Sequence, residues 1–166
     1  IEILKLPVKK YREEALRLIE LVGLKGFENK MPNELSGGMQ SRVAICRALI
    51  HDPSLLAKDE PFAALDAMTR EEMSIWLLRL WEERRKTVVF VTHNIREAVL
   101  LADRVIVMTC RPARVLKDIC IDLPRPRTID MELTPQFGAY LEEIRNLIFG
   151  TQTSLPKEYY SRISVE

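Results

Sequence analysis

Two acidic residues and a histidine follow apolar runs of the sequence and could carry out acid–base or metal chemistry. Asp59 and Glu60 close the run PSLLAKDEP, and His93 closes the run TVVFVTH. Ligands bind beyond the carboxyl ends of strands in open α/β sheets, so polar groups at two such ends predict a shared site. One carboxylate could hold Mg²⁺ while its neighbour polarises a water. Taken alone, an Asp–Glu pair before proline marks a turn, and a lone histidine is usually an ordinary loop residue.

A second candidate site is the pair of adjacent glycines in the stretch NELSGGMQSRV, residues 33–43. The sequence holds six glycines, and Gly37 and Gly38 follow Ser36 directly before a run with helical spacing. The first turn of a helix leaves backbone N–H groups unpaired and carries partial positive charge. Glycine there lets another molecule approach closely. The stretch therefore predicts an anion site, with a phosphate as the favoured anion.

Helices and strands alternate along the chain and would position these residues. Apolar residues recur at helical spacing in five segments, and short apolar or β-branched runs predict four strands. The run TVVFVTH is typical of a strand buried on both faces of a parallel sheet. The alternation predicts an α/β fold with a mostly parallel sheet flanked by helices. The expected helices are 8–22, 39–50, a segment from Asp66 or Thr69 through Leu80, 94–102 and 137–148, and the expected strands are PSLLAKDEP, TVVFVTH, DRVIVMT and ARVLKDICID.

Three further positions carry local expectations. Asp66 or Thr69 is expected to cap the helix that follows, with Thr69 and Glu72 at the spacing of a capping box. Lys58 interrupts an otherwise apolar strand, and burying an unpaired ammonium is costly. It must therefore reach solvent, pair with an acid or lower its pKa, and a nearby acidic partner is the favoured solution. The stretch LPRPRTID has two prolines in three residues and predicts a linker or surface strap.

Composition places the 166-residue chain among globular proteins of about one domain and narrows the classes of partner. Lys and Arg total 25 against 24 for Asp and Glu, so no nucleic-acid partner is expected. The three cysteines form no CxxC pair and favour a reducing compartment. No apolar run in the sequence reaches the roughly 20 residues that span a bilayer. The chain begins with Ile1 and shows no signal peptide, and we expect it to be part of a longer protein.

Together these stretches resemble the motifs of the ATP-binding subunits of ABC transporters. LSGGMQ is similar to the signature motif of that family, LLAKDEP to its Walker B segment, ALD to its D-loop and TH to its switch histidine. The order and separation of the four fragments also match, and residues 32–109 carry nearly all of the resemblance. DEPFAALDAMTR and THNIREAVLLADRVIVMTCRPARV are most similar to importers of nitrate, sulfonate, taurine and related small anions.

The resemblance implies an ATP site that two subunits share. Ser36, Gly37 and Gly38 would contact the γ-phosphate of an ATP molecule held mainly by a second ATPase subunit. Gln40 would support the signature loop, with a nucleotide contact as the second possibility. Asp66 would cross the interface of the dimer and couple the two sites.

The same resemblance assigns hydrolysis to the residues that follow the two strands. Asp59 would hold Mg²⁺ through water, Glu60 would act as general base on the attacking water, and His93 would contact the γ-phosphate as a switch. ATP and Mg²⁺ are thus the implied cofactors. The implied protein powers import of a small anionic solute as a peripheral subunit at the cytoplasmic face of the inner or plasma membrane. Its implied partners are a second ATPase subunit, a transmembrane permease and, indirectly, a solute-binding protein.

One element of the family pattern does not occur in these residues. A P-loop needs the pattern GxxxxGK followed by Ser or Thr, and no glycine here is followed by lysine. The Walker A strand, the adenine-stacking aromatic residue and the glutamine loop of the family are expected to precede Ile1. We therefore expect this chain alone neither to bind ATP tightly nor to hydrolyse it. The alternative is a truncated, non-catalytic module that completes the ATP site of a partner subunit in trans.

The implied fold is part of a P-loop NTPase fold and divides into three segments. Residues 1–52 would hold the end of a helical subdomain and the signature helix. Residues 53–123 would form the α/β core with the Walker B segment, the D-loop and the switch histidine. Residues 124–166 would form a C-terminal linker and helix. Without the strands expected before Ile1, the sheet should expose apolar surface.

Overall fold

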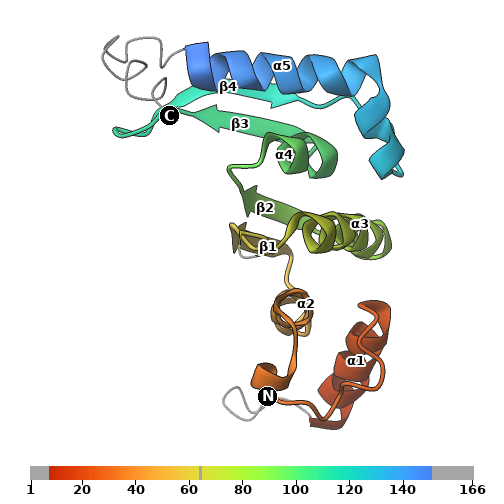
Figure 1. The fold of residues 1–166 in the computed structure, drawn as a ribbon. Coiled ribbons are helices and arrows are strands. Elements are labelled where there is room, and N and C mark those ends of the chain that lie inside the picture. The colour runs from red at the N-terminus through yellow and green to blue at the C-terminus, as the bar shows by residue number, and fades with distance from the viewer. Residues whose placement is uncertain (1–7, 64, 151–166) are drawn as a thin grey trace, which may run out of the picture. The chain divides into compact units, whose positions relative to one another are not determined.

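The computed structural model describes residues 8–63 and 65–150, which form two compact units (Figure 1). The first unit ends at His93 and the second begins at Asn94. Both units combine helices with a pair of strands, which confirms the predicted α/β class. The predicted functional division into segments 1–52, 53–123 and 124–166 stays a prediction.

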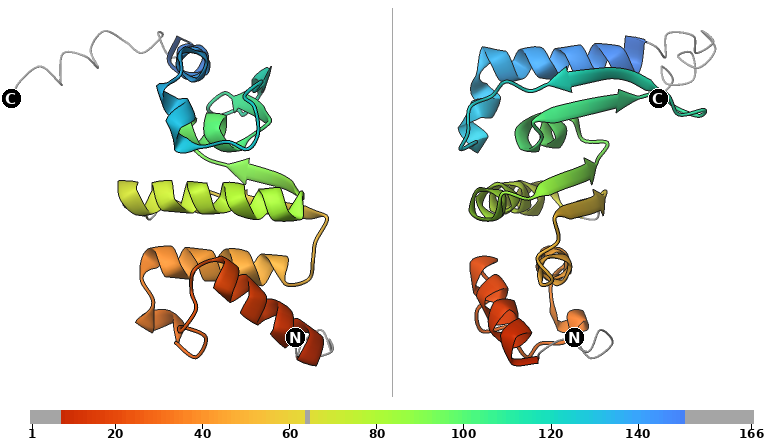
Figure 2. Two further views of the ribbon diagram at one scale, coloured as in Figure 1. Left: turned by 90° about the vertical axis from the view of Figure 1, so that its right-hand side faces the viewer. Right: turned by 180° about the vertical axis from the view of Figure 1, so that it is seen from behind.

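The first unit alternates helices with the two strands of a parallel sheet. Helix α2 contacts both α1 and α3 and lies between them (Figure 2). The helices and strands fall where the sequence predicts them, with ends that differ by a few residues. The described elements are α1 (Val8–Leu21), a short 3-10 helix (Pro32–Glu34), α2 (Gly37–Leu49), β1 (Leu55–Asp59), α3 (Ala67–Arg84) and β2 (Thr87–Val91).

The apolar core of the first unit lies between the helices and one face of the sheet. The predicted inner face of α3 is buried, with Met73 fully inaccessible and Leu80 3% exposed. Leu18 of α1 is also fully inaccessible. Arg42 of α2 donates to Glu72 of α3 at 3.1 Å and to the backbone carbonyl of Val22 at 3.2 Å. These two bonds tie α2 to the start of α3 and to the segment that follows α1.

The parallel sheet has one packed face and one open face. In the register of β1 and β2, Ala57 is paired with Val89 and Asp59 with Val91. Val89 and Val91 are 51% and 52% exposed, and Leu55 on the same face is 52% exposed. The prediction that β2 is buried on both faces is therefore wrong, because the described helices of this unit cover only the opposite face. The expected exposure of apolar surface is confirmed for the described strands.

Lys58 lies on the packed face of the sheet, and its ammonium group bonds to a backbone carbonyl instead of an acidic side chain. Its Nζ donates to the backbone carbonyl of Ala44 in α2 at 3.5 Å, and no ion pair of Lys58 occurs among the described residues. Burial lowers the pKa of Lys58, and the positive charge of Arg47 lowers it further. Of the three expected solutions the favoured acidic partner is wrong, because successive side chains of a strand point to opposite faces, and the lowered pKa is the one that the structure supports. The adjacent Asp59 therefore belongs to the open face.

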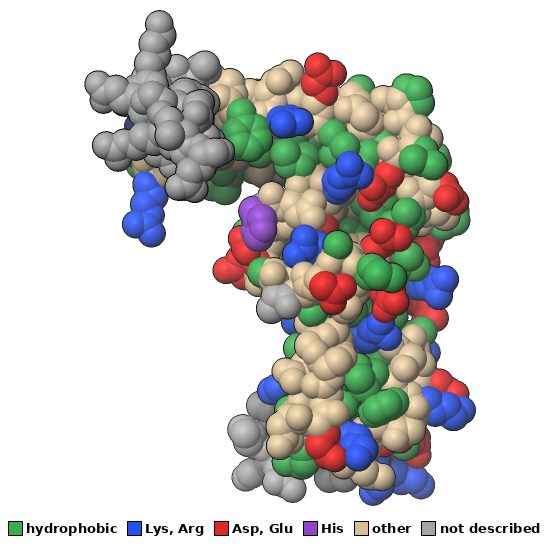
Figure 3. Space-filling view, in the orientation of Figure 1, with side chains coloured by type: hydrophobic (Ala, Val, Ile, Leu, Met, Phe, Trp, Pro, Cys, Tyr) green, Lys and Arg blue, Asp and Glu red, His purple; other side chains and the backbone are tan. Residues whose placement is uncertain are grey.

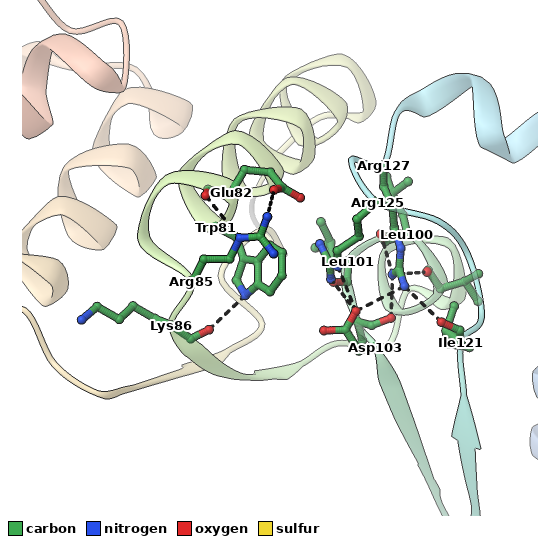
Figure 4. Close-up of polar contacts among 12 residues, drawn as sticks. Trp81, Glu82, Arg85, Lys86, Leu100, Leu101, Asp103, Ile121, Arg125 and Arg127 are labelled. Atoms are coloured by element: carbon green, nitrogen blue, oxygen red, sulfur yellow. Dashed lines mark hydrogen bonds and ion pairs between the residues drawn. The ribbon is translucent and has the colours of Figure 1, made fainter.

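The end of α3 directs the chain into β2 through a compact turn (Figure 4). Arg85, in the left-handed backbone conformation at φ 48°, caps the helix by donating its N–H to the carbonyl of Trp81 at 2.7 Å. Its guanidinium lies 4.8 Å from the centre of the Trp81 ring. The indole N–H in turn donates to the carbonyl of Lys86 at 3.0 Å. Both sides of the turn are thus fixed immediately before β2 begins at Thr87.

The second unit packs a helix along an antiparallel hairpin (Figure 2). Residue Arg104 is paired with Cys120 and Val105 with Ile119. The expectation of a mostly parallel sheet therefore holds for β1 and β2 but is wrong for this pair, whose short connection returns the chain directly. The described elements are α4 (Ile95–Leu101), β3 (Arg104–Met108), β4 (Val115–Cys120), a 3-10 helix (Ile129–Leu133) and α5 (Pro135–Gly150).

The stretch LPRPRTID, predicted to be a linker or surface strap, has no helix or strand before the 3-10 helix begins at Ile129, but one of its arginines is a core residue of the second unit. Arg127 is 5% exposed, and its guanidinium donates to the carbonyls of Leu100 at 3.1 Å and Ala102 at 2.6 Å (Figure 4). These carbonyls belong to the end of α4, where helix acceptors lack intrahelical donors. Asp103 pairs with Arg127 and with Arg125 at the same place. The strap is thus anchored to α4 by charge-assisted hydrogen bonds.

Candidate functional site

Ser36 caps α2 and creates an anion-compatible helix start. Its backbone is extended, its Oγ accepts the N–H of Met39 at 3.3 Å, and the helix begins at Gly37. The predicted helix of 39–50 therefore starts two residues earlier than expected. The N–H groups of Gly37 and Gly38 precede the intrahelical hydrogen bonds of α2 and point out of its first turn. The hydroxyl of Ser36 can still donate to a ligand oxygen while it accepts from Met39.

Gln40 supports the loop that leads into this helix. Its Nε2 donates to the backbone carbonyls of Pro32 at 2.9 Å and Leu35 at 3.1 Å. Both acceptors precede Ser36 in the chain, so the side-chain amide of Gln40 holds the loop that leads into α2. This is the geometry expected of a loop support, the first of the two roles that the sequence leaves to Gln40.

The two glycines of the signature stretch differ in their surroundings. A Cβ atom built on Gly38 would lie 2.5 Å from Cγ2 of Thr69, a distance at which the Thr69 side chain or its surroundings must shift. A Cβ atom on Gly37 would meet only Cδ2 of Leu65, at an ordinary 3.7 Å. Gly38 is therefore required by the close approach of α2 to α3. Sequence reasoning missed this contact, because the two residues are far apart in the chain.

Asp66 is the N-cap of α3. Its Oδ1 accepts the N–H of Thr69 at 3.0 Å, and its Oδ2 accepts the hydroxyl of Thr69 at 2.7 Å. The hydrogen bonds from Thr69 lower the pKa of this carboxyl. Of the two predicted caps Asp66 is correct, and the capping box of Thr69 with Glu72 is wrong, because Glu72 pairs with Arg42 instead.

Glu60 and His93 meet at the carboxyl ends of the two parallel strands. His93 Nδ1 lies 2.9 Å from Glu60 Oε1, and both side chains are accessible, at 69% and 41%. The N–H of Glu60 donates to the carbonyl of Val91 at 2.8 Å, which anchors the residue to β2. Its φ of 42° lies in the left-handed region, which is uncommon for a residue with a side chain. The contact brings together the two strand ends that the sequence marks as a shared site.

Asp59 offers a single carboxylate beside this pair. It ends β1 on the open face of the sheet, where it is exposed and paired in register with Val91. No group of three or more His, Cys, Asp or Glu that could hold a metal occurs among the described residues. Mg²⁺ is commonly held by one or two carboxylates together with substrate phosphates and waters. A lone exposed carboxylate fits such an ion and does not fit a metal caged by protein alone.

Charge is mixed on the one face of the molecule that the space-filling view shows. On that face, acidic and basic side chains are interspersed (Figure 3). Among the described residues, no helix is long and apolar enough to cross a membrane.

Comparison with known proteins gives a consistent relationship. Residues 3–63 match the family model described as ABC transporter. The chain is 47% identical over 148 residues to an uncharacterized ABC transporter ATP-binding protein of Methanocaldococcus jannaschii, and the match covers 89% of this chain and 54% of that protein. It is 48% identical over 142 residues to the aliphatic sulfonates import ATP-binding protein SsuB of Bacillus licheniformis, with 86% and 54% covered.

A solved structure agrees with this relationship. A dimeric ATP-binding cassette in a post-hydrolysis state, bound to ADP and Pi, is 37% identical with a TM-score of 0.57. The match covers 72% of this chain and 50% of that one. The chain thus spans about half the length of the curated relatives that it matches. In its sequence matches, its fold and the order of its motifs, the chain is similar to about half of an ABC transporter ATP-binding protein.

Proposed function

We propose that this protein is an ATP-binding subunit that hydrolyses ATP to drive import of a small anionic solute. The observation that carries the hydrolytic part is the 2.9 Å contact between Glu60 and His93. A carboxylate at the end of a strand, held against an imidazole and open to solvent, can accept a proton from a water molecule. The similarity to ABC transporter ATP-binding proteins supports the γ-phosphate of ATP as the group that this water attacks.

The three residues of the proposed site have distinct roles. Glu60 accepts the proton of the attacking water, and His93 orients that carboxylate through Nδ1. In the protonated imidazole both ring nitrogens donate, so Nε2 of His93 can also donate to a phosphate oxygen. Asp59 holds Mg²⁺ through water, and the ion would neutralise charge on the phosphates.

The hydrolytic role can be tested in a chimera that restores the absent sequence pattern. The part of Bacillus licheniformis SsuB outside the matched region, joined ahead of this chain, is the expected source of a P-loop. We expect the chimera to release phosphate from Mg-ATP and Glu60→Gln to slow release by about 10²–10⁴-fold, as loss of a general base does. Retained ATP binding by the Glu60→Gln chimera is the control for folding. Unchanged turnover of this variant would remove Glu60 from the mechanism.

The proposed solute class is an aliphatic sulfonate or a similar small anion. It is supported by the 48% identity to the SsuB protein of Bacillus licheniformis and by further SsuB proteins of Bacillus cereus at 45% and 46%. Replacement of the chromosomal SsuB protein by the chimera tests this class. Growth on an aliphatic sulfonate as sole sulfur source is the expected result, and growth on sulfate alone would contradict it.

The proposed partners are a second ATPase subunit and a membrane-embedded permease, which would place the protein at the cytoplasmic face of the membrane. The first unit offers a surface for the permease in a cavity of about 340 Å³ between α1, α2 and the loop that joins them. Its wall is mainly apolar and includes Leu18, Phe27 and Val43, with Phe27 42% exposed. Phe27→Glu in the chimera should abolish co-purification with the permease and spare nucleotide binding.

A second candidate function is a module that completes the ATP site of a partner in trans. It is supported by the helix start at Ser36, which is formed by residues of the first unit alone. The test mixes this chain with full-length SsuB of Bacillus licheniformis whose own signature serine is changed to arginine. Stimulated phosphate release supports the module, and release that does not change with added chain contradicts it.

A further inference from the structure

We propose that Thr69 is a positioning residue that locks the signature helix α2 to the D-loop cap of α3. The inference rests on the proposed function, in which the start of α2 and Asp66 both act toward a nucleotide shared with a second subunit. Thr69 contacts neither nucleotide nor water in this scheme. It acts through two different parts of its side chain, and each part holds one of the two elements.

The hydroxyl of Thr69 holds the D-loop. It donates to Asp66 Oδ2 at 2.7 Å while the backbone N–H of the same residue donates to Oδ1 at 3.0 Å. Both oxygens of Asp66 are thus engaged within one turn of α3. The carboxylate has a fixed orientation, because two donors of one residue bind its two oxygens.

The methyl group of Thr69 holds the signature helix. Cγ2 occupies the space that a side chain at position 38 would need, since a Cβ atom there would lie 2.5 Å away. Gly38 is buried, whereas Gly37 and Ser36 before it are exposed. The buried side of the first turn of α2, at Gly38, therefore packs directly on Thr69.

Two neighbouring contacts restrict the same junction. Cδ2 of Leu65, which is 7% exposed, lies 3.7 Å from the Cβ position of Gly37. Arg70 donates to the carbonyl of Leu65 at 3.0 Å and so ties the residue before Asp66 to α3. The segment from Leu65 to Thr69 and the first turn of α2 form one packed body.

This packing has a consequence for the shared site. If the start of α2 moves relative to a nucleotide on the second subunit, Asp66 moves with it. The signature stretch and the D-loop then keep a fixed position relative to each other. A change at Thr69 alters that relation without removing any group that touches the ligand.

The contact itself is tested by a double-mutant cycle of Gly38→Ala and Thr69→Ser in the 166-residue chain, measured by urea denaturation. Overpacking at Gly38 should lower the ratio of folded to unfolded chain by about tenfold in the Thr69 background. Thr69→Ser removes Cγ2, so the same alanine should be neutral or favourable in that background. Gly37→Ala is the matched control and should be tolerated. Equal effects of Gly38→Ala in both backgrounds would overturn the lock.

The positioning role is tested with the mixture of this chain and signature-defective SsuB. At saturating chain, Thr69→Ser and Thr69→Val should each lower the maximal stimulated rate by about fivefold or more, a loss of the size seen when packed contacts couple. Ile45→Val, a buried change elsewhere in α2, is the control. It should change only the concentration of chain that gives half-maximal stimulation and leave the maximal rate unaltered. Full maximal rates for both Thr69 variants would overturn the role. An unaltered chain that stimulates nothing would overturn the trans function and this role with it, and the double-mutant cycle would still decide the contact.

Discussion

His93 Nδ1 lies 2.9 Å from Glu60 Oε1, although the whole of α3 separates the two residues in the chain. The crossover explains the contact. A helix that links two parallel strands returns the chain to the same end of the sheet, so that both strands finish side by side. The N–H of Glu60 bonds to the carbonyl of Val91 and fixes the registration of the two strand ends. The fold thus assembles the proposed catalytic pair from two separate stretches of sequence.

Removal of the imidazole should slow turnover more than it weakens binding. His93→Ala in the chimera leaves Glu60 without its 2.9 Å partner, and we expect kcat to fall by about 10²-fold or more with a smaller change in KM. Steady-state phosphate release over a range of ATP concentrations measures both constants. A rise in KM at constant kcat would instead assign His93 to uniform binding of the nucleotide.

The three cysteines should differ in reactivity. Cys46 is buried beneath α1, where its Sγ lies 3.8 Å from the carbonyl of Leu18, and burial raises the pKa of its thiol to about 11. Cys110 and Cys120 are exposed. Because the thiolate is the reactive form, iodoacetamide at pH 8 should label the two exposed cysteines rapidly and Cys46 only in denaturant. Peptide mass spectrometry gives the rates, and equal labelling of all three would show that α1 does not pack on α2.

Lys58→Met should stabilise the first unit at neutral pH. The pKa of Lys58 is lower in the folded chain than in the unfolded chain, so the unfolded state binds more protons between the lowered pKa and the ordinary lysine value of 10.5. The contribution of Lys58 to the free energy of unfolding of the wild type therefore rises as the pH rises between these two values. Below the lowered pKa this contribution is constant. Methionine removes the buried charge, and solvent screening limits the gain to about 1 kcal/mol.

Urea denaturation of both proteins at pH 7 and pH 10 measures the effect. The difference between Lys58→Met and wild type should shrink at the higher pH. Lys9→Met, an exposed lysine of α1, is the matched control. A less stable Lys58→Met protein at pH 7 would mean that the bond to the carbonyl of Ala44 outweighs the cost of burial.

A charge on the open face of the sheet should reduce self-association. Val89 is 51% exposed between other apolar side chains of β1 and β2, and such surfaces favour association. Val89→Lys should lower the concentration dependence of light scattering and sedimentation relative to wild type. Thr87→Lys places the same charge at the edge of the face and serves as the control. Equal concentration dependence for wild type and Val89→Lys would show that this face does not mediate self-association.

Sequence patterns predict the elements and the strand ends of this protein because those features depend on local composition. The apolar runs at residues 55–59 and 87–91, the serine before two glycines and the asparagine at position 94 each specify where an element starts or ends. The meeting of Glu60 with His93 follows from the rule that parallel strands end at one edge.

The remaining features depend on contacts between distant residues. The space beside Gly38 is filled by Thr69, the buried Arg127 binds the end of α4, and the amine of Lys58 finds a carbonyl of α2. No local pattern encodes these partners, since each lies on another element. The exposure of one face of β2 likewise depends on which helices cover the sheet. The apolar sequence of the strand alone does not predict it.

The claim that Ser36 and its helix act on a nucleotide of another subunit has one most direct test. The chain is added to signature-defective SsuB of Bacillus licheniformis, and phosphate release is recorded for wild type and for Ser36→Arg, whose side chain would block the helix start. The account predicts release that rises with added wild-type chain and no rise with Ser36→Arg at equal helicity by circular dichroism. Equal stimulation by the two chains would contradict it.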